Sequence, residues 1–288
     1  MFFGPLSRGS RSVTAADVSL TGVVFSEGFS TSLAIEDVTG DGRADLVAGA
    51  PRAPVEGEVP GRAYVFFAPI EPGSRSAGTA DAILEGAEVS DMFGTALATG
   101  DLDDDGHADL AVGANDLFRG DLVGRVYAFA GPISSGRHGA SSADALILGE
   151  PADPYGDTFG SALAVADHDG DGIDDLAIGA WASDAGGVRS GRVWFFYGPL
   201  PCNAAAAAAD VLYTGERFDL LGQGVANAGD LDGDGFEDLL LGAPGFYDDE
   251  PDSYVRVVLG HPRTSSSIGH PVPHYLSCQA RLNSPRRR

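Results

Sequence analysis

The chain has 288 residues and a formal net charge of −24, because 42 acidic residues outnumber 18 basic ones. A chain of this length can bury a sizeable core. Its acidity disfavours nucleic acid as a partner, since neutralising phosphates requires clustered cations. The sequence contains no apolar run long enough to span a membrane.

The first predicted elements lie near the N-terminus. The apolar stretch Phe2–Leu6 contains a proline, as a β-strand that runs into a turn would, and a further strand is expected near Val18–Gly22. Similar proline-ended stretches return four times along the chain and mark a repeated unit. These later copies begin at Phe66, Phe129, Phe196 and Val257.

The best-defined unit contains four predicted strands, separated by turns rich in Gly, Pro, Ser and Asp. These strands are Phe93–Gly100, Ala108–Ala114, Gly124–Ala130 and Asp144–Gly149. In the next unit the alanine run Ala204–Ala209 falls between the third and fourth strands, so we expect an elongated loop there rather than a helix. After Pro262 the repeat is lost, and residues 263–288 are expected to form a disordered tail.

Four aspartate-rich loops recur at near-constant spacing between predicted strands. Their first aspartates, Asp37, Asp101, Asp167 and Asp230, lie 64, 66 and 63 residues apart. Each loop has nine residues, begins and ends with aspartate and carries glycine at position 6, so we interpret each as a calcium cage. The loops are Asp37–Asp45, Asp101–Asp109, Asp167–Asp175 and Asp230–Asp238.

A hard dication takes several oxygen ligands, which side chains at positions 1, 3, 5 and 9 can supply together with a main-chain carbonyl at position 7. The expected side-chain ligands are Asp37, Thr39, Asp41 and Asp45; Asp101, Asp103, Asp105 and Asp109; Asp167, Asp169, Asp171 and Asp175; and Asp230, Asp232, Asp234 and Asp238. The position-7 carbonyls would come from Arg43, His107, Ile173 and Phe236. Up to four calcium ions are predicted, and Thr39 makes the first site the weakest because it lacks a carboxylate.

An EF-hand loop begins in the same way but has a glutamate at position 12 and lies between two helices. Here position 12 is apolar in every loop, and the flanking segments are short apolar runs that end in glycine, so each loop is predicted to join two strands. The position-12 residues are Ala48, Val112, Ile178 and Leu241. Such loops can also be plain hairpin turns with solvated charge, but four copies of one carboxylate register favour metal binding.

Four-stranded units at a fixed period predict an all-β fold, a β-propeller of four-stranded blades. The units pack radially around an axis because a single small sheet cannot bury its faces alone. The first strands carry small residues such as Ala96 and Ala98, as crowding near the axis requires, and the third carry large ones such as Tyr127 and Phe129, which would fill the space between blades. No amphipathic helices separate the strands, which excludes a parallel α/β fold.

Phe93-Gly94, the aspartate loop and Val112-Gly113-Ala114 together resemble the FG-GAP repeats of the integrin α-subunit β-propeller and its bacterial relatives. The resemblance covers residues 2–262 and implies a calcium-loaded propeller that acts in cell adhesion or protein interaction. Two copies depart from the motif, because Phe29-Ser30 and Leu221-Gly222 replace its Phe-Gly pair.

Propellers of this family have seven blades, whereas the chain supplies four aspartate loops. Two hypotheses are open at this point. Either the strand near Val18 completes the last unit and closes a four-bladed ring, or the chain is an open segment of a larger propeller.

Calcium cages of this kind fill at millimolar extracellular calcium and poorly at resting cytosolic levels. A secreted or cell-surface setting is therefore expected, although the first residues, Met1 to Pro5, lack the charged start and apolar stretch of a signal peptide. Cys202 and Cys278 are the only cysteines and could form one disulfide in an oxidising compartment.

The sequence shows no catalytic pattern. It contains no Gly-x-Ser-x-Gly, no His-Glu-x-x-His and no phosphate-binding loop. Carboxylate pairs that could suggest glycoside hydrolysis are better explained as metal ligands. A non-catalytic module is therefore predicted, and the alternative is an enzyme, or an accessory propeller of one, that acts on carbohydrate or phosphoester substrates.

A protein or glycan ligand is expected on the face opposite the calcium loops, where the connections between second and third strands emerge. These connections carry aromatic and arginine residues suited to anchoring a partner, namely Phe118, Arg119, Trp181, Phe246 and Tyr247. Trp181 could equally fold back and cap its blade. Arg119-Gly120-Asp121 also matches the tripeptide that integrins recognise, but three residues carry too little information to assign that role.

Overall fold

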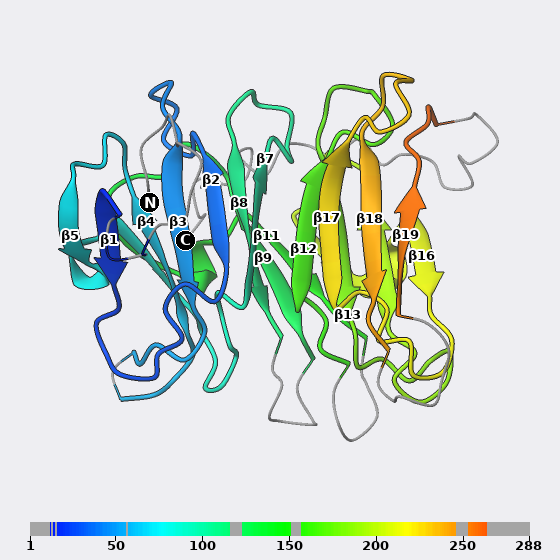
Figure 1. Ribbon diagram of the computed structural model, residues 1–288, viewed down its shortest axis with the longest axis horizontal. Helices are drawn as coiled ribbons and strands as arrows, with labels where there is room; N and C mark the ends of the chain where they lie inside the picture. Colours follow the sequence, from blue (N-terminus) through cyan, green and yellow to red (C-terminus); the bar gives the residue numbers. More distant parts are fainter. Residues whose placement is uncertain are drawn as a thin grey trace, which may run out of the picture.

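Short, mainly antiparallel sheets make up the molecule (Figure 1). The computed structural model describes residues 12, 14, 16–55, 57–115, 123–150, 157–245 and 253–263. Four sheets follow one another along this part of the chain, and each begins with the same hydrogen-bonded order of first, second and third strand. These sheets are four consecutive blades of a β-propeller, which confirms the predicted all-β fold.

Within each blade, strands adjacent in the sheet pair antiparallel, and the first strand lies at one edge. The first strands are β2 (Leu33–Glu36), β7 (Ala96–Gly100), β12 (Ala162–Ala166) and β17 (Gly224–Gly229). The second strands are β3 (Asp45–Ala50), β8 (Asp109–Ala114), β13 (Asp175–Ala180) and β18 (Asp238–Ala243). The third strands are β4 (Arg62–Phe66), β9 (Arg125–Phe129), β14 (Arg192–Phe196) and β19 (Tyr254–Val258). The fourth strands are β6 (Ala82–Glu85), β11 (Ala145–Leu148) and β16 (Val211–Thr214).

The strands expected from the sequence are confirmed wherever the structure describes the chain. The four strands of the second unit appear as β7, β8, β9 and β11, each shorter than predicted by one or more terminal residues. The strand expected near Val18 appears as β1 (Val18–Thr21). The predicted strand Phe2–Leu6 and all of the expected tail after Arg263 lie outside the described residues.

Each of the first three blades has a short additional strand that the sequence did not predict. This strand pairs with an outer strand that precedes the blade in the chain. β5 (Gly73–Ser76), β10 (Gly136–Gly139) and β15 (Asn203–Ala205) run parallel to β1, β6 and β11, respectively. A 3-10 turn follows each of them: η2 (Ala77–Thr79), η3 (Ala140–Ser142) and η4 (Ala206–Ala208). The alanine run after Asn203 is therefore not an α-helix, as expected, but it forms part of a strand and a turn rather than a plain loop.

The position of β1 decides between the closed ring and the open segment. β1 pairs with β5 of the first blade, and the sheet of the last blade has the order β17-β18-β19 without it. The hypothesis that the strand near Val18 completes the last blade is therefore wrong. β1 pairs in parallel with β5, just as β6, the fourth strand of the first blade, pairs in parallel with β10 of the second. By this comparison, β1 is an outer strand that precedes the first blade.

Side-chain size determines how the blades stack. The first strands, among them β7 and β12 with their small residues, lie side by side in the middle of the molecule (Figure 1). Large third-strand residues fill the space between blades, as predicted. Tyr127 and Phe129 of the second blade pack with Val47 and Val65 of the first in one buried cluster. Burial of each such large side chain contributes about 1.5–3 kcal/mol.

Backbone packs directly against backbone at each blade boundary. A Cβ atom on Gly113 of the second blade would lie 2.1 Å from the carbonyl oxygen of Gly160 in the third. Equivalent contacts join Gly49 to Gly94 and Gly179 to Gly222. Gly160 also has a positive φ of 85°, and Ser30, which replaces the motif glycine in the first repeat, adopts the same left-handed conformation with a φ of 66°. The two glycines of the repeat are thus required by the contact between blades.

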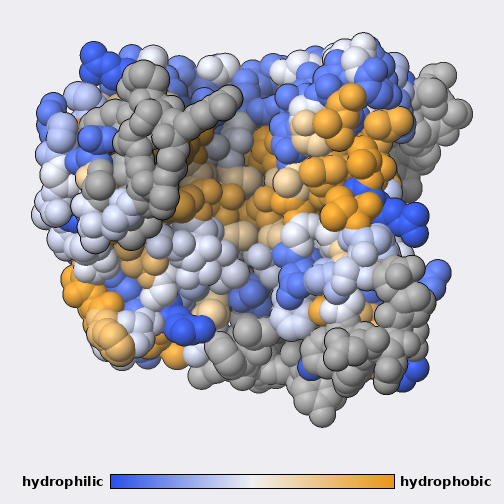
Figure 2. All heavy atoms as spheres, in the orientation of Figure 1, coloured by the Kyte–Doolittle hydropathy of each residue, from blue (hydrophilic) through white to orange (hydrophobic). Residues whose placement is uncertain are grey.

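Each of the first three blades packs against the blade that follows it in the chain. Within the described residues, no further blade packs in this way against the fourth. Val255 of β19 is 64% exposed, whereas Val126 and Val193, which occupy the same register position in β9 and β14, are 1% and 0% exposed. Figure 2 shows apolar surface over the region of β17 to β19. The last blade therefore presents a sheet face of the kind that the other blades bury.

These contacts predict unequal effects of adding a methyl group at two equivalent glycines. Gly113→Ala should lower the free energy of unfolding by about 1–3 kcal/mol, since the Cβ would overlap backbone of the next blade. Gly242→Ala is the matched control, because the nearest atom outside its chain neighbours is the Gly224 carbonyl oxygen at 3.2 Å. Urea unfolding measures both, and equal losses would contradict the proposed role of the blade contact.

Candidate metal centres

The four aspartate loops lie at one end of the blades, where each connects a first strand to a second strand. They join β2 to β3, β7 to β8, β12 to β13 and β17 to β18, and they form the upper edge of the molecule in Figure 1. The predicted placement of the loops between two strands is thus confirmed. Because neighbouring strands are antiparallel, the connections between second and third strands emerge at the opposite end.

Backbone N–H groups fold each loop around its first aspartate. One carboxylate oxygen at position 1 accepts a hydrogen bond from the position-6 glycine N–H, at 2.7, 2.9, 3.1 and 2.9 Å in the four loops in chain order. The position-5 carboxylate accepts the N–H of position 7, at 2.9, 2.9, 3.0 and 3.0 Å. The chain around positions 5 to 7 is therefore wrapped so that several carboxylates converge. Participation of the position-7 carbonyls remains a prediction.

The aspartate at position 9 connects the loop to the body of its blade. All four of these residues, Asp45, Asp109, Asp175 and Asp238, are buried. One oxygen of each accepts an N–H at the end of the third strand, from Ala68, Gly131, Gly198 and Gly260, at 2.8 to 2.9 Å. The other oxygen accepts an N–H of the loop itself, from Thr39, Leu102, His168 and Leu231. A buried carboxylate thus links the ends of three strands.

Three of the four loops bring together carboxylate oxygens that could share a metal ion. In each of these groups, one oxygen from each of three aspartates lies within 4.8 Å of the others. The groups are Asp101, Asp103 and Asp109; Asp167, Asp169 and Asp175; and Asp230, Asp232 and Asp234. The aspartates of the first loop form no such group. Thr39 occupies position 3 of this loop, where the other three loops have aspartate, and a weaker first site is predicted for that reason.

The donor set fits a hard cation such as calcium. The oxygens come from carboxylates in a flexible loop, which are the ligands that calcium prefers. In the second loop, Asp103 Oδ1 is buried and has no hydrogen-bond partner among the described residues. Leaving a charged oxygen buried and unpaired is costly, so this atom calls for a cation.

The pKa values of two of the buried position-9 carboxyl groups are raised for the same reason. Burial, with a further contribution from the neighbouring charge of Asp103, raises the pKa of Asp109 from 3.8 to about 7. Burial and the charge of Asp169 likewise raise the pKa of Asp175 to about 8. Burial thus disfavours the ionised form of these two groups, which an added cation would favour.

These raised pKa values predict how stability depends on pH without calcium. Between pH 4 and pH 7 the folded chain holds protons on Asp109 and Asp175 that the unfolded chain has released, so the free energy of unfolding should fall as pH rises through this window. Denaturant unfolding in chelator at pH 5, 6, 7 and 8 measures the fall. Asp109→Asn should reduce the slope, and saturating calcium should abolish it. A free energy that rises steadily from pH 5 to pH 8 in chelator would contradict the assignment.

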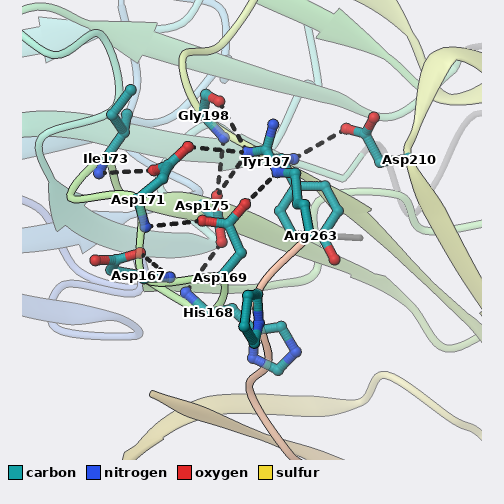
Figure 3. Close-up of polar contacts among 12 residues, drawn as sticks. Asp167, His168, Asp169, Asp171, Ile173, Asp175, Tyr197, Gly198, Asp210 and Arg263 are labelled. Carbon is teal, nitrogen blue, oxygen red and sulfur yellow. Dashed lines mark hydrogen bonds and ion pairs between the residues drawn. The ribbon is translucent and has the colours of Figure 1, made fainter. Parts of the chain in front are cut away.

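The third loop already faces a positive charge from the protein itself. Arg263, which follows β19, reaches in among Asp169, Asp171 and Asp175, and Figure 3 shows its guanidinium group among their side chains. Sequence reasoning missed this residue, although a signal was present. The residues after Pro132 and Pro199 are the apolar Ile133 and Leu200, whereas an arginine follows Pro262.

The predicted anchors on the opposite end are largely outside the described residues. This applies to Phe118, Arg119, Phe246 and Tyr247, and also to Asp121 of the Arg-Gly-Asp tripeptide and to Cys278. Trp181 is described. It directly follows β13 and is half-buried, so it remains a candidate both for partner binding and for capping its blade.

Repeated blades with an aspartate loop between the first and second strands define a repeat β-propeller with candidate metal sites. A family model for the FG-GAP repeat matches residues 29–66, 93–129, 159–196 and 221–258, each of which runs from the Phe-Gly position to the end of a third strand. The chain belongs to the FG-GAP repeat family, which confirms the resemblance noted from its motifs.

Known proteins with related sequences include a phospholipase D and integrin alpha chains. Phosphatidylinositol-glycan-specific phospholipase D of Rattus norvegicus is 34% identical over 206 residues, covering 68% of this chain and 24% of that protein. Integrin alpha-IIb of Homo sapiens is 37% identical over 164 residues, covering 54% of this chain and 15% of the integrin. Integrin alpha-X of Homo sapiens is 32% identical over 225 residues, covering 76% of this chain and 18% of the integrin. The chain thus spans at most 24% of the length of these three relatives.

Among the described residues there is no helix with the length and apolar character needed to cross a membrane.

Proposed function

We propose that this chain is a calcium-stabilised, non-catalytic propeller module that binds a protein or glycan ligand in cell adhesion or protein interaction. One observation carries the calcium part of the proposal. Three aspartate loops each gather three carboxylate oxygens within 4.8 Å, at equivalent places of successive blades. A shared role that depends on the fold explains this repetition better than chance clustering of surface charge.

Calcium would supply positive charge and several coordination bonds to carboxylate and carbonyl oxygens. Asp101, Asp103 and Asp109 would hold it in the second loop, with Asp105 and the carbonyl of His107 as further ligands. Asp109 also accepts the N–H of Gly131 at the end of β9, so an ion held there would fasten the loop to the third strand. Equivalent residues would act in the other loops, with Thr39 in place of a carboxylate in the first.

The expected gain in stability is large compared with the stability of a typical domain. An ion that binds only the folded chain stabilises it by about 2.7 kcal/mol when its concentration is 100 times its Kd. Several such sites together would rival the whole folding free energy of a domain, about 5–15 kcal/mol. Calcium would also offset part of the net charge of −24.

Substituting two adjacent aspartates of the second loop, one at a time, tests the proposed calcium site, because each substitution removes the same charge. Asp103→Asn should remove one bound calcium ion and lower the calcium-dependent gain in unfolding free energy by about 2–3 kcal/mol. Asp104→Asn is the control, because Asp104 lies outside the ligand register, and asparagine tolerates its positive φ of 64°. Calorimetry counts the ions, and thermal unfolding in calcium and in chelator measures stability. If both variants retain the ion count and melting shift of the unmodified chain, the second site is not a calcium cage.

Ligand recognition would occur at the end opposite the aspartate loops. The integrin relatives support adhesion or protein interaction as the role of such a propeller. The connection after β13, which carries Trp181, would contribute an aromatic anchor, with Phe118, Arg119, Phe246 and Tyr247 on the neighbouring connections. The chain would act in secretions or at the cell surface, where millimolar calcium can fill the cages.

The second candidate function is that of an accessory propeller in an enzyme. The similarity to a phospholipase D favours this alternative, since the match covers 68% of the present chain. A panel of phosphoester and glycoside substrates, assayed with calcium, separates the two functions. We expect no turnover from this chain, because its clustered carboxylates are assigned to metal binding. Turnover that disappears in an active-site variant would show catalysis and contradict the non-catalytic proposal.

A further inference from the structure

Arg263 contacts three aspartates of the third loop at once. Its Nε atom forms an ion pair with Asp169 Oδ2, and its Nη2 atom lies 3.4 Å from Asp171 Oδ2 and 4.0 Å from Asp175 Oδ1. Nη2 also donates a hydrogen bond to the Gly198 carbonyl oxygen at 3.1 Å. The guanidinium carbon lies 4.2 Å from the ring centroid of Tyr197. Figure 3 shows these groups around one point.

The chain places an arginine here because the fourth blade departs from the pattern of the two before it. The residue after the proline at the end of the third strand is Ile133 in the second blade and Leu200 in the third, and both side chains are buried. Each also donates its N–H to the preceding loop, to Val38 and Leu102. In the fourth blade the corresponding hydrogen bond comes from His261, whose N–H donates to the His168 carbonyl oxygen at 3.0 Å, and Arg263 follows two residues later. A guanidinium cannot enter an apolar core without a partner, and the nearest partners are the carboxylates of the third loop.

The guanidinium and a metal ion would compete for the same oxygens. Asp169 and Asp175 belong to the group of three carboxylates that could hold an ion in this loop, and both contact Arg263. Asp169 and Asp175 are buried, and a buried negative charge is costly unless a cation lies beside it. One cation can meet this need at a time, since a second would be repelled at such close range.

We propose that Arg263 is a built-in competitor for calcium at the third loop, so that this site binds calcium only when the arginine withdraws. The inference rests on the proposed calcium function and adds a regulation of one site. The third loop then fills at higher calcium concentration than the second and fourth loops, in which the described residues place no arginine or lysine within ion-pair distance. Filling it releases Arg263 from Tyr197 and from the Gly198 carbonyl.

Calcium titration of the full chain, with the metal alone as the probe, tests this competition. Arg263→Gln removes the charge and keeps a polar side chain, and Arg263→Leu removes the charge and places an apolar side chain there. Arg256→Gln is the control with the same loss of charge, because Arg256 lies on β19 and its guanidinium stacks on the Tyr254 ring, away from the loops. We expect both Arg263 variants to bind calcium about tenfold more tightly at one site by calorimetry, while the control behaves like the unmodified chain.

A second readout assigns the effect to the third loop. In the Asp169→Asn background, Arg263→Gln should no longer change calcium affinity, since the competed site is already damaged. In chelator, Arg263→Gln should lower the melting temperature, because the buried carboxylates lose their cation, and in saturating calcium this difference should vanish. A structural role without competition would lower the melting temperature equally in both conditions.

The possible outcomes separate this inference from the proposed function. If the unmodified chain binds calcium and both Arg263 variants bind it with unchanged affinity, Arg263 is not a competitor, although the cages remain. If neither the unmodified chain nor any variant binds calcium, the proposed function fails and the competition fails with it. Tightening of one site in both variants, absent in the Asp169→Asn background, establishes the competition.

Discussion

The buried aspartate at the end of each loop is the constraint on which the blade depends. Asp109 accepts one N–H from its own loop and another from Gly131 at the end of β9, so it joins the ends of three strands through one side chain. Satisfying backbone groups in this way stabilises the fold, but it places a carboxylate out of contact with water beside other carboxylates. The raised pKa of Asp109 reflects that conflict. The same residue that organises the blade therefore creates its need for a cation.

The repeats resolve this charge problem differently, although their backbones are alike. Thr39 removes one carboxylate from the first loop, so fewer like charges are held together there. In the third loop Arg263 supplies a positive charge from the chain itself. The second loop keeps its full set of acids and an unpaired buried oxygen on Asp103. One loop geometry can thus give sites of graded demand for calcium, because demand depends on the number of charges and on the cations nearby rather than on the path of the backbone.

Contact between blades imposes a second and independent constraint. The paired glycines let two backbones meet where any Cβ would intrude, as at Gly113 and Gly160, and large third-strand side chains fill the remaining space. The aspartate loops lie at one end of this stack, and the connections proposed to bind a ligand lie at the other. The packed blades between them hold the two ends at a fixed separation, so the metal sites would act on ligand binding through stability rather than through direct contact.

The sequence by itself determined the four blades, their main strands and the place of the four aspartate loops between strands, because short alternating strands and a nine-residue aspartate turn are set by neighbouring residues. It also indicated that the first loop differs, through Thr39. Only the tertiary structure decided the partner of β1, the additional parallel strands such as β5, and the approach of Arg263 to Asp169. Each of these pairs residues more than 50 positions apart in the chain, and local patterns carry no information about which distant segments meet. The charge that balances the third loop is therefore a property of the assembled blades.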